Sequence, residues 1–292
     1  MGKITKAVIP AAGFGTRFLP ATKAVPKEML PVVDVPIVQR IVEEAVQSGI
    51  RDIVLVIGRG KRAIEEHFDR NVELELALEK KGKAEILEAV RAPTGLADIH
   101  FVWQHEMRGL GDAVRCARAH VGDEPFAVLL GDTLLQPHAG VPATRRLVDA
   151  YERTGTSVLA LEEVPLERVS KYGVIKGESL GGGLWRVDDM VEKPAPEEAP
   201  SRMAVASRYV LTPDIFDALD RIPPGKGGEL QLTDALRLLA AKRPFHGFQV
   251  DSTRWDAGNA LGYLKVNIAY ALERPDLREP LLAFLRETVQ NS

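Results

Sequence analysis

Three short segments of the chain are apolar at nearly every position, and they constrain the fold more than any other feature. They are residues 6–11, 52–57 and 126–130. A strand with one face in water alternates apolar and polar residues, whereas a parallel strand covered on both faces is apolar throughout. Between the first two segments, apolar residues recur at helical spacing over residues 37–46, and Gly49 follows as a helix end. This alternation predicts an α/β fold with a Rossmann-like, mixed and mostly parallel sheet flanked by helices.

The second half of the chain has a different texture. Residues 172–177 and 184–193 are strand-like and lie on either side of the glycine triplet 181–183, which indicates antiparallel sheet. Helical patterns return at residues 229–241 and 260–272. We therefore expect a small antiparallel region beside the main sheet, followed by C-terminal helices.

The domain organisation follows from these patterns. We expect one α/β domain over residues 1–255 and a C-terminal helical appendage over residues 256–292. Residues 69–98 interrupt the strand–helix alternation with a charge-rich stretch in which leucines recur at helical spacing, which predicts a helical insertion on the surface. The amphipathic C-terminal helices are candidates for self-association as a homodimer or a homotetramer.

Composition excludes several classes of partner. With 292 residues, of which 45% are hydrophobic and 27% charged, the chain can bury a core. The net charge is −3 and there is no long basic run, so nucleic acid is not an expected partner. No apolar run reaches the length of about 18 residues that predicts a membrane span. Cys116 is the only cysteine, so no intrachain disulfide can form, which is typical of the reducing cytoplasm.

The strongest functional feature is a glycine turn that follows the first apolar segment. Its sequence is Gly13-Phe-Gly15-Thr16-Arg17, and Lys27 follows among several prolines. Glycines let the backbone approach an anion and direct N–H groups toward it. Arg17 and Lys27 add formal positive charge to the same segment. The stretch therefore predicts a binding site for a polyphosphate.

Two other glycine loops do not match this sequence. A P-loop requires Lys followed by Ser or Thr, but Thr16-Arg17 stands at that place. The dinucleotide fingerprint of dehydrogenases requires a third small residue where Phe18 stands, and an acidic residue at the end of a second strand. Asp34 lies near that distance, but its proline-rich surroundings do not suit a central strand. A dehydrogenase is therefore a distant alternative.

The complete motif is Gly13-x-Gly15-Thr-Arg17-x-x-Pro-x-Thr-Lys-x-x-Pro-Lys27. It resembles the signature of the sugar-1-phosphate nucleotidylyltransferases. With Ala11-Ala12 before the turn, the chain is similar to the bacterial branch that uses UTP and glucose 1-phosphate. The likeness extends from residue 6 to about residue 270.

The resemblance implies transfer of a uridylyl group from UTP to α-D-glucose 1-phosphate, with release of pyrophosphate. The attacking phosphate oxygen is already largely anionic at neutral pH, so no residue has to remove a proton from it. The difficulty is electrostatic, because two polyanions must meet while charge moves onto the leaving pyrophosphate. Such a reaction requires cations, Mg²⁺ and rigid positioning of both substrates.

Three side chains are the candidates for catalysis. By resemblance, Arg17 grips the triphosphate and stabilises the leaving pyrophosphate, while Lys27 contacts the transferred α-phosphate and the incoming phosphate. Asp132 follows a buried strand at the edge where α/β sheets bind ligands, and a carboxylate there can hold Mg²⁺. Asp256 resembles the aspartate of a late motif that supplies a second metal ligand. The interpretation requires Arg17, Lys27 and Asp132 to border one cavity.

The remaining contacts also follow from the resemblance. Nucleotide contacts fall to Ala11, Ala12, Gly13, Gly15, Thr16, Glu28, Gln104 and Gly109. The side-chain amide of Gln104 offers both a donor and an acceptor, which can match the edge of uracil. Sugar-phosphate contacts fall to Gly173, Glu192 and Lys193. Ser207 is a departure, because this family usually has glycine there, and it leaves the choice of hexose less determined than the choice of nucleotide.

Two further functions stay open at this point. A thymidylyl- or cytidylyltransferase for a sugar 1-phosphate would use a related site, but such relatives usually have Gly-Gly in place of Ala11-Ala12 and lack the insertion at residues 69–98. A catalytically silent nucleotide-sugar sensor would keep the same fold. The presence of Arg17, Lys27 and Asp132 together argues against the sensor.

Overall fold

The three apolar segments form neighbouring strands in the computed structural model, which describes residues 2–291. Strand β1 (Lys6–Pro10) lies between β4 (Asp52–Ile57) and β6 (Phe126–Leu129) and pairs with both in parallel. Within β1, Ala7 points into one apolar core and its neighbour Val8 into the other. A strand covered on both faces has no position that favours a polar residue, which explains the uninterrupted apolar segments.

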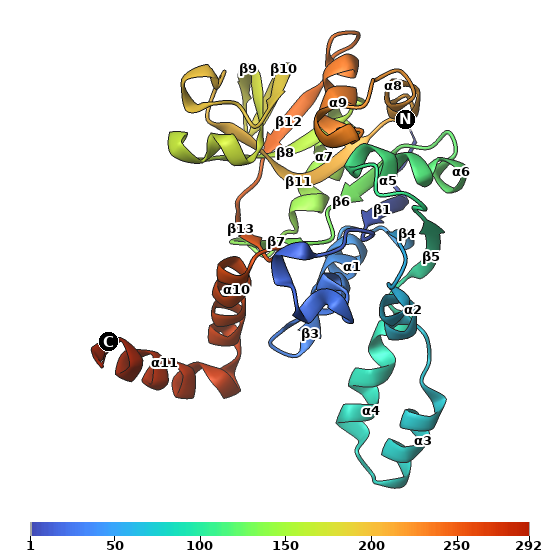
Figure 1. Ribbon diagram of the computed structural model, residues 1–292, viewed down its shortest axis with the longest axis vertical. Coiled ribbons are helices and arrows are strands. Elements are labelled where there is room, and N and C mark those ends of the chain that lie inside the picture. The colour runs from blue at the N-terminus through green and yellow to red at the C-terminus, as the bar shows by residue number, and fades with distance from the viewer. Residues whose placement is uncertain (1, 292) are drawn as a thin grey trace.

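These strands belong to one nine-stranded sheet (Figure 1). Its order is β5 (Asp98–Trp103), β4, β1, β6, β11 (Met203–Leu211), β8 (Val158–Glu163), β12 (His246–Gln249), β10 (Leu184–Glu192) and β9 (Gly173–Gly181). Strands β11 and β10 run antiparallel to both of their neighbours, and the remaining strands share one direction. The predicted mixed, mostly parallel sheet is confirmed, and the predicted antiparallel region is the β10–β9 end of the same sheet.

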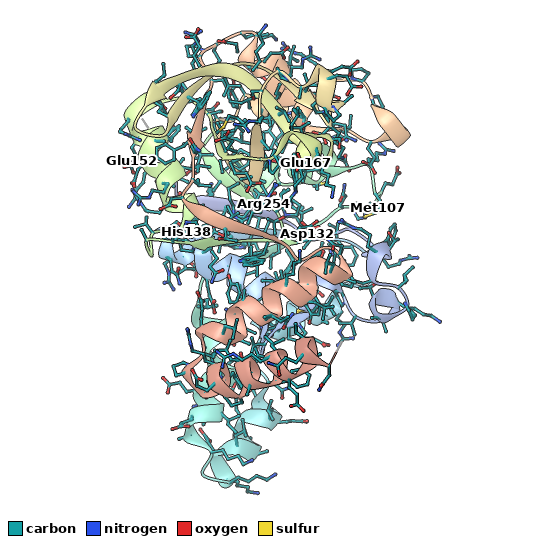
Figure 2. The ribbon with its side chains drawn as sticks, turned by 90° about the vertical axis from the view of Figure 1, so that its left-hand side faces the viewer. Met107, Asp132, His138, Glu152, Glu167 and Arg254 are labelled. Atoms are coloured by element: carbon teal, nitrogen blue, oxygen red, sulfur yellow. The ribbon has the colours of Figure 1, made fainter. Side chains whose placement is uncertain are left out.

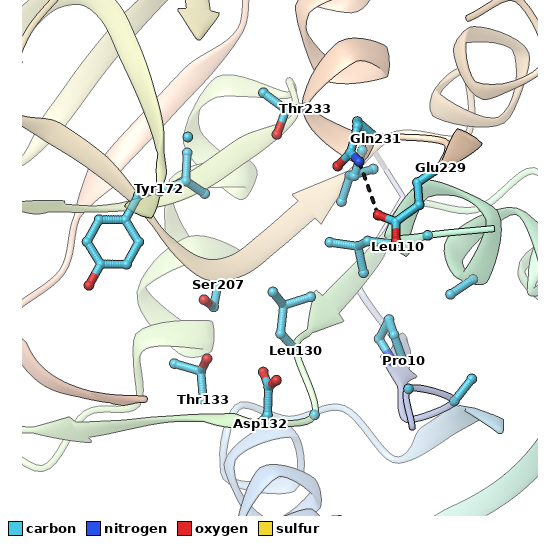
Figure 3. A pocket seen from close by; sticks show the side chains of 18 of the residues that line it. Pro10, Leu110, Leu130, Asp132, Thr133, Tyr172, Ser207, Glu229, Gln231 and Thr233 are labelled. Atoms are coloured by element: carbon cyan, nitrogen blue, oxygen red, sulfur yellow. Dashed lines mark hydrogen bonds between the residues drawn. The ribbon is translucent and has the colours of Figure 1, made fainter. Parts of the chain in front are cut away.

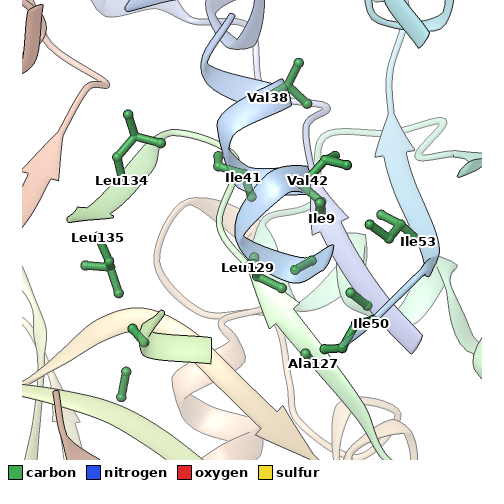
Figure 4. Packing of buried hydrophobic residues seen from close by; sticks show 14 of the residues in the cluster. Ile9, Val38, Ile41, Val42, Ile50, Ile53, Ala127, Leu129, Leu134 and Leu135 are labelled. Carbon is green, nitrogen blue, oxygen red and sulfur yellow. The ribbon is translucent and has the colours of Figure 1, made fainter. Parts of the chain in front are cut away.

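Helices cover both faces of the sheet. One face packs against α1 (Ile37–Gln47), α2 (Arg62–Phe68) and α7 (Ala143–Thr154). The opposite face packs against α5 (Leu110–Cys116), α6 (Arg118–Val121), α8 (Ile215–Leu219) and α9 (Leu232–Ala240). Figure 4 shows Ile41 and Val42 of α1 lying over Ile9 and Leu129 of the sheet. The helical spacing of these apolar residues therefore places one stripe of α1 against the sheet.

The charge-rich stretch between α2 and β5 forms a helical hairpin of α3 (Val72–Lys80) and α4 (Ala84–Arg91), which projects away from the sheet in Figure 1. The carboxylate of Glu75 is buried between the guanidinium groups of Arg70 and Arg91, at 2.7 and 2.8 Å. This buried double ion pair joins the two helices. Strand β5 begins at Asp98, so the last residue of the predicted insertion lies in the main sheet.

A two-stranded ribbon connects the sheet to the C-terminal helices. Strand β7 (Thr133–Pro137) pairs antiparallel with β13 (Ser252–Asp256), and the register places Asp256 opposite Thr133. Helices α10 (Ala260–Glu273) and α11 (Pro275–Gln290) follow and extend away from the sheet (Figures 1 and 2). A further short ribbon, close to the glycine turn in sequence, is formed by β2 (Pro31–Val32) and β3 (Val35–Pro36). Among residues 2–291, no helix combines the length and apolar character needed to span a membrane.

Candidate active site

A cavity of about 690 Å³ opens beyond the carboxyl ends of β1 and β6. Figure 3 shows Asp132, Thr133, Ser207 and Tyr172 around it, contributed by three separate parts of the chain. With the exception of Ala11, every predicted site residue lines this cavity: Ala12, Gly13, Gly15, Thr16, Arg17, Lys27, Glu28, Gln104, Gly109, Asp132, Gly173, Glu192, Lys193 and Asp256. The requirement that Arg17, Lys27 and Asp132 border one cavity is therefore met.

Ala11 occupies a different position. It is buried, and its backbone N–H donates a hydrogen bond to the carbonyl oxygen of Val56 at 2.7 Å. The neighbouring strand therefore uses this donor. On the structure, the backbone groups that face the cavity begin with Ala12 and Gly13.

Two cations and two carboxylates meet at one point of the cavity wall. The Nζ atom of Lys27 donates to Oδ2 of Asp132 at 2.6 Å. The guanidinium of Arg17 lies 3.9 Å from the same oxygen and 4.0 Å from Oδ2 of Asp256. Burial opposes ionisation of Asp132, but the charge and hydrogen bond of Lys27 together with the charge of Arg17 lower its pKa. Asp132 is therefore a carboxylate at neutral pH.

The turn after β13 leaves a small space between these charges. A Cβ atom at Gly258 would come within 2.9 Å of Arg17 Nη2, 3.1 Å of Asp256 Oδ1 and 3.2 Å of Asp132 Oδ2. Glycine at this position therefore keeps the space between the two carboxylates open. The Asp256 carboxylate is oriented by the N–H of Gly258 at 2.9 Å and by the side-chain amide of Asn259 at 2.8 Å. Two fixed carboxylates beside an open space form the kind of hard-oxygen site that suits Mg²⁺.

A buried ion pair between Lys61 and Glu28 contacts the backbone of the glycine turn. Nζ of Lys61 lies 2.6 Å from Oε2 of Glu28 and 2.7 Å from the carbonyl oxygen of Gly13. Burial raises the pKa of Glu28, and the charges of Lys61 and Lys27 oppose that shift. Within the described part of the chain, Oε1 of Glu28 is buried and accepts no hydrogen bond. This oxygen is available to a donor of a bound nucleotide.

The side-chain amide nitrogen of Gln104 is already used in hydrogen bonds within the protein, which the sequence does not indicate. Its Nε2 group donates to the carbonyl oxygen of Gly109 at 3.1 Å and to Oδ2 of Asp112 at 2.9 Å. Asp112 is itself held by Arg115 at 2.6 Å. Because the carboxylate of Asp112 requires a donor, the amide nitrogen of Gln104 faces it and the amide oxygen is left for a ligand.

The opposite end of the cavity is assembled from β9, β10, β11 and α9. Gly173 pairs with Glu192 across β9 and β10, and Oγ1 of Thr233 donates to Oε2 of Glu192 at 2.7 Å. Nζ of Lys193 lies 3.1 Å from Oε1 of the same carboxylate. Two residues here have left-handed backbone conformations, with φ of 49° at Lys193 and 61° at Ser207. At Ser207 this conformation coincides with an irregularity in the pairing of β11 with β8.

Sequence reasoning missed three residues of this site: Lys61, Thr233 and Arg254. The guanidinium carbon of Arg254 lies 3.7 Å from the ring centre of Tyr172, and its nitrogen pairs with Glu162. Figure 2 shows Arg254 and Asp132 in the region between the sheet and the C-terminal helices. Arg254 stands two residues before Asp256, which is the only local signal for it. Lys61 and Thr233 reach the site through contacts that no short motif encodes.

A glycine turn at a strand end, facing paired cations and carboxylates, defines an enzyme that handles a polyphosphate and transfers a phosphorus-containing group. The chain belongs to the nucleotidyl transferase family, whose model matches residues 6–273. A UTP–glucose-1-phosphate uridylyltransferase of Bacillus subtilis is 52% identical over 288 residues, covering 99% of this chain and 96% of the relative. Another protein of that name, from Staphylococcus epidermidis, is 50% identical and covers 98% of this chain and 99% of the relative.

The chain is also similar in fold to solved structures of UDP-glucose pyrophosphorylases. A crystal structure of UDP-glucose pyrophosphorylase complexed with UDP-glucose superposes with a TM-score of 0.84 at 44% identity, covering 93% of this chain and all of the other. A UTP-bound structure from Acinetobacter baumannii superposes with a TM-score of 0.91 at 38% identity, covering 97% and 99% of the two chains.

Proposed function

We propose that the protein transfers a uridylyl group from UTP to α-D-glucose 1-phosphate, with formation of UDP-glucose and release of pyrophosphate. The observation that carries the proposal is the meeting of Arg17, Lys27, Asp132 and Asp256 at one point of the cavity. Relatives of this name at about half identity over nearly the full chain support the choice of substrates.

The chain supplies charge and position for this reaction. The sugar phosphate attacks the α-phosphate of UTP, the bond to pyrophosphate breaks, and negative charge moves onto the leaving group. Arg17, with its side chain 58% exposed, is free to reach the β- and γ-phosphates and stabilise that charge. Lys27 is more buried and fixed by Asp132, so its ammonium stands where the transferred phosphate passes. Each charged hydrogen bond contributes about 1.5–3 kcal/mol.

Asp132 and Asp256 are the residues that would hold Mg²⁺. The fit rests on their hard oxygen donors and on the open space beside Gly258. When bound, Mg²⁺ neutralises part of the triphosphate charge. Asp132 has a second task, because it also fixes the ammonium of Lys27.

The two ends of the cavity hold the two substrates. We assign the uracil to Ala12, Gly13, Gln104 and Gly109, with Glu28 as a buried acceptor beside them. We assign the hexose to Gly173 and Glu192 and its phosphate to Lys193. Gly173 leaves room for the Glu192 carboxylate, since a Cβ atom at Gly173 would come within 3.2 Å of it.

We also propose self-association through the C-terminal helices and a cytoplasmic location. Large apolar side chains are exposed on α10 and α11, including Leu261, Leu264, Phe284 and Val289. A homodimer or a homotetramer would cover them. The single cysteine, Cys116, is in line with a reducing compartment.

Pyrophosphate release, measured with UTP, dTTP, CTP and ATP against several sugar 1-phosphates, tests the function. We expect the highest kcat/KM for UTP with glucose 1-phosphate. A preference for dTTP or CTP would select the related transferases instead. No turnover with any pair would select the nucleotide-sugar sensor.

A further inference from the structure

A second cluster of ligand-type side chains lies away from the cavity. It consists of Asp52 at the start of β4, His100 on β5 and His120 on α6, none of which lines the cavity. The His120 Nε2 atom lies 2.7 Å from Oδ1 of Asp52, and the His100 Nε2 atom lies 3.7 Å from the same oxygen. One ligand atom from each residue lies within 4.8 Å of the other two.

The fold brings these residues together by register and packing. Strands β4 and β5 are parallel with Val54 opposite His100, so Asp52, two residues before Val54, shares a face with His100. Val54 belongs to the same apolar core as Val121, the last residue of α6. The packing of α6 on this face of the sheet therefore places His120 beside Asp52 and His100. The two imidazole rings lie 4.5 Å apart between their centres.

We propose that Asp52, His100 and His120 bind a transition-metal dication, with Zn²⁺ as the best match. Imidazole nitrogens favour Zn²⁺, Cu²⁺ and Ni²⁺ over Mg²⁺ and Ca²⁺, and a carboxylate oxygen is a common third ligand. Three protein ligands leave a fourth tetrahedral position for water. The site is thus chemically distinct from the all-carboxylate pair Asp132 and Asp256.

The geometry requires only small adjustments. Zinc ligands lie about 2.0–2.2 Å from the metal in a tetrahedral arrangement, which places them about 3.4 Å from one another. The 2.7 Å distance between His120 and Asp52 must therefore lengthen, and the 3.7 Å distance between His100 and Asp52 must shorten slightly. The side chains of His100 and Asp52 are 50% and 33% exposed, so they can rotate without disturbing the core. His120, the most buried of the three at 22%, already contacts Asp52 and provides the fixed point.

One cation lies near the cluster. Nζ of Lys6 donates to the carbonyl oxygens of His120 and Val121, both at 3.2 Å, and to Oε1 of Glu124 at 2.7 Å. These acceptors hold the ammonium on the backbone side of His120, and Glu124 offsets its charge. Lys6 therefore lowers the affinity of the site for a dication without occupying the metal position.

A metal at this position would join an edge strand to a helix. Strand β5 lies at one edge of the nine-stranded sheet, where it pairs with β4, and it leads directly into Gln104. Edge strands open more readily than central ones because they are paired on one side only. Zinc would therefore slow the opening of β5, and hydrogen exchange at its amides would report this.

Zinc titration of tag-free protein in excess Mg²⁺ tests the proposal. We expect one Zn²⁺ per chain in the wild type, with two imidazole ligands visible in X-ray absorption at the zinc edge. His100→Ala and His120→Ala should each weaken zinc affinity at least tenfold. Both variants should keep wild-type pyrophosphate release in metal-defined Mg²⁺ buffer, which shows that they fold.

Two other variants serve as matched controls. The imidazole of His138 lies away from the cluster and contacts Asp251 and Thr253, at 2.6 and 2.8 Å, so His138→Ala should leave zinc affinity unchanged. Cys116→Ser should do the same and exclude thiolate binding. Equal zinc affinity in wild type, His100→Ala and His120→Ala would overturn the proposal, as would a wild type that binds no zinc. In the exchange experiment, zinc should slow the β5 amides of the wild type and not those of His120→Ala.

Discussion

The nucleotide end and the sugar end of the cavity are built in different ways. The nucleotide end uses mainly one continuous segment, residues 12–28, which follows the first strand of the sheet. The sugar end draws its groups from four separate elements, β9, β10, β11 and α9, which are spread over residues 173–240. The first can be recognised in a short motif, whereas the second exists only after the antiparallel strands have paired.

The ends also differ in how they hold charge. The Glu28–Lys61 pair has side chains 0% and 6% exposed and an N–O distance of 2.6 Å. The Glu192–Lys193 pair has side chains 29% and 59% exposed and a distance of 3.1 Å. Charges that water does not screen are fixed by their partners, whereas exposed charges are free to adapt. We therefore infer a rigid choice of nucleotide and a more adaptable choice of hexose.

The largest expected effect tests the rigid end. Lys27→Ala removes the ammonium held by Asp132, and turnover should fall about 10²–10³-fold. Steady-state pyrophosphate release measures this, with thermal unfolding as a check on folding. Lys176→Ala, an exposed lysine of β9, is the matched control and should retain normal rates. Wild-type turnover in Lys27→Ala would remove this residue from the mechanism.

The next effect concerns the proposed metal ligand. Asp132→Asn keeps the shape of the side chain but loses its charge, so turnover should fall about 10²-fold and more Mg²⁺ should be needed for half-maximal rate. A Mg²⁺ titration of the initial rate measures both quantities. Asp251→Asn, at an exposed aspartate outside the cavity, is the control. If excess chelator left wild-type activity unchanged, the metal hypothesis would fail.

A smaller effect is expected at the sugar end. Thr233→Val removes the hydrogen bond to Glu192, at a cost of about 1 kcal/mol. KM for glucose 1-phosphate should rise about fivefold, while KM for UTP stays the same. Thr233→Ser keeps the hydroxyl and should restore the wild-type value. Equal changes in both KM values would show that the two ends are not separable.

The buried pair Glu28–Lys61 should also make the stability of the protein depend on pH. Burial raises the pKa of Glu28 in the folded protein above its ordinary value of 4.5. The folded state therefore binds this proton more tightly than the unfolded state. The free energy of unfolding falls as pH rises from the unfolded-state pKa of Glu28 to its higher folded-state pKa. Relative to Glu28→Gln, the wild type should lose free energy of unfolding as pH rises above 4.5, measured by urea denaturation. A constant difference between the two proteins would contradict the shift.

The smallest effect is expected at Ser207. Its φ of 61° costs a non-glycine residue about 1 kcal/mol, which glycine avoids. Ser207→Gly should raise Tm by about 2–4 °C, whereas Ser207→Ala should not. KM for glucose 1-phosphate should change less in both variants than in Thr233→Val. A lower Tm in Ser207→Gly would show that the hydroxyl stabilises the turn by more than the strain costs.

Much of the fold could be read from local pattern. The three apolar segments became β1, β4 and β6, and the helical spacing over residues 37–46 became α1. Strand β12 had no such pattern, because His246–Gln249 is short and contains glycine and two polar residues. It lies in the sheet because β8 and β10 pair with it on either side. Pairing of this kind depends on strands that are distant in sequence.

The sequence by itself determined the parallel strands, the glycine turn and the two cations that follow it. These features are local, since side-chain periodicity and backbone freedom act over a few residues. Only the tertiary structure decided that Asp256 stands beside Asp132, that Lys61 holds Glu28, and that Thr233 reaches Glu192. Such contacts join residues 33 to 124 positions apart, and their formation depends on the packing free energy of the whole chain, which no short motif contains.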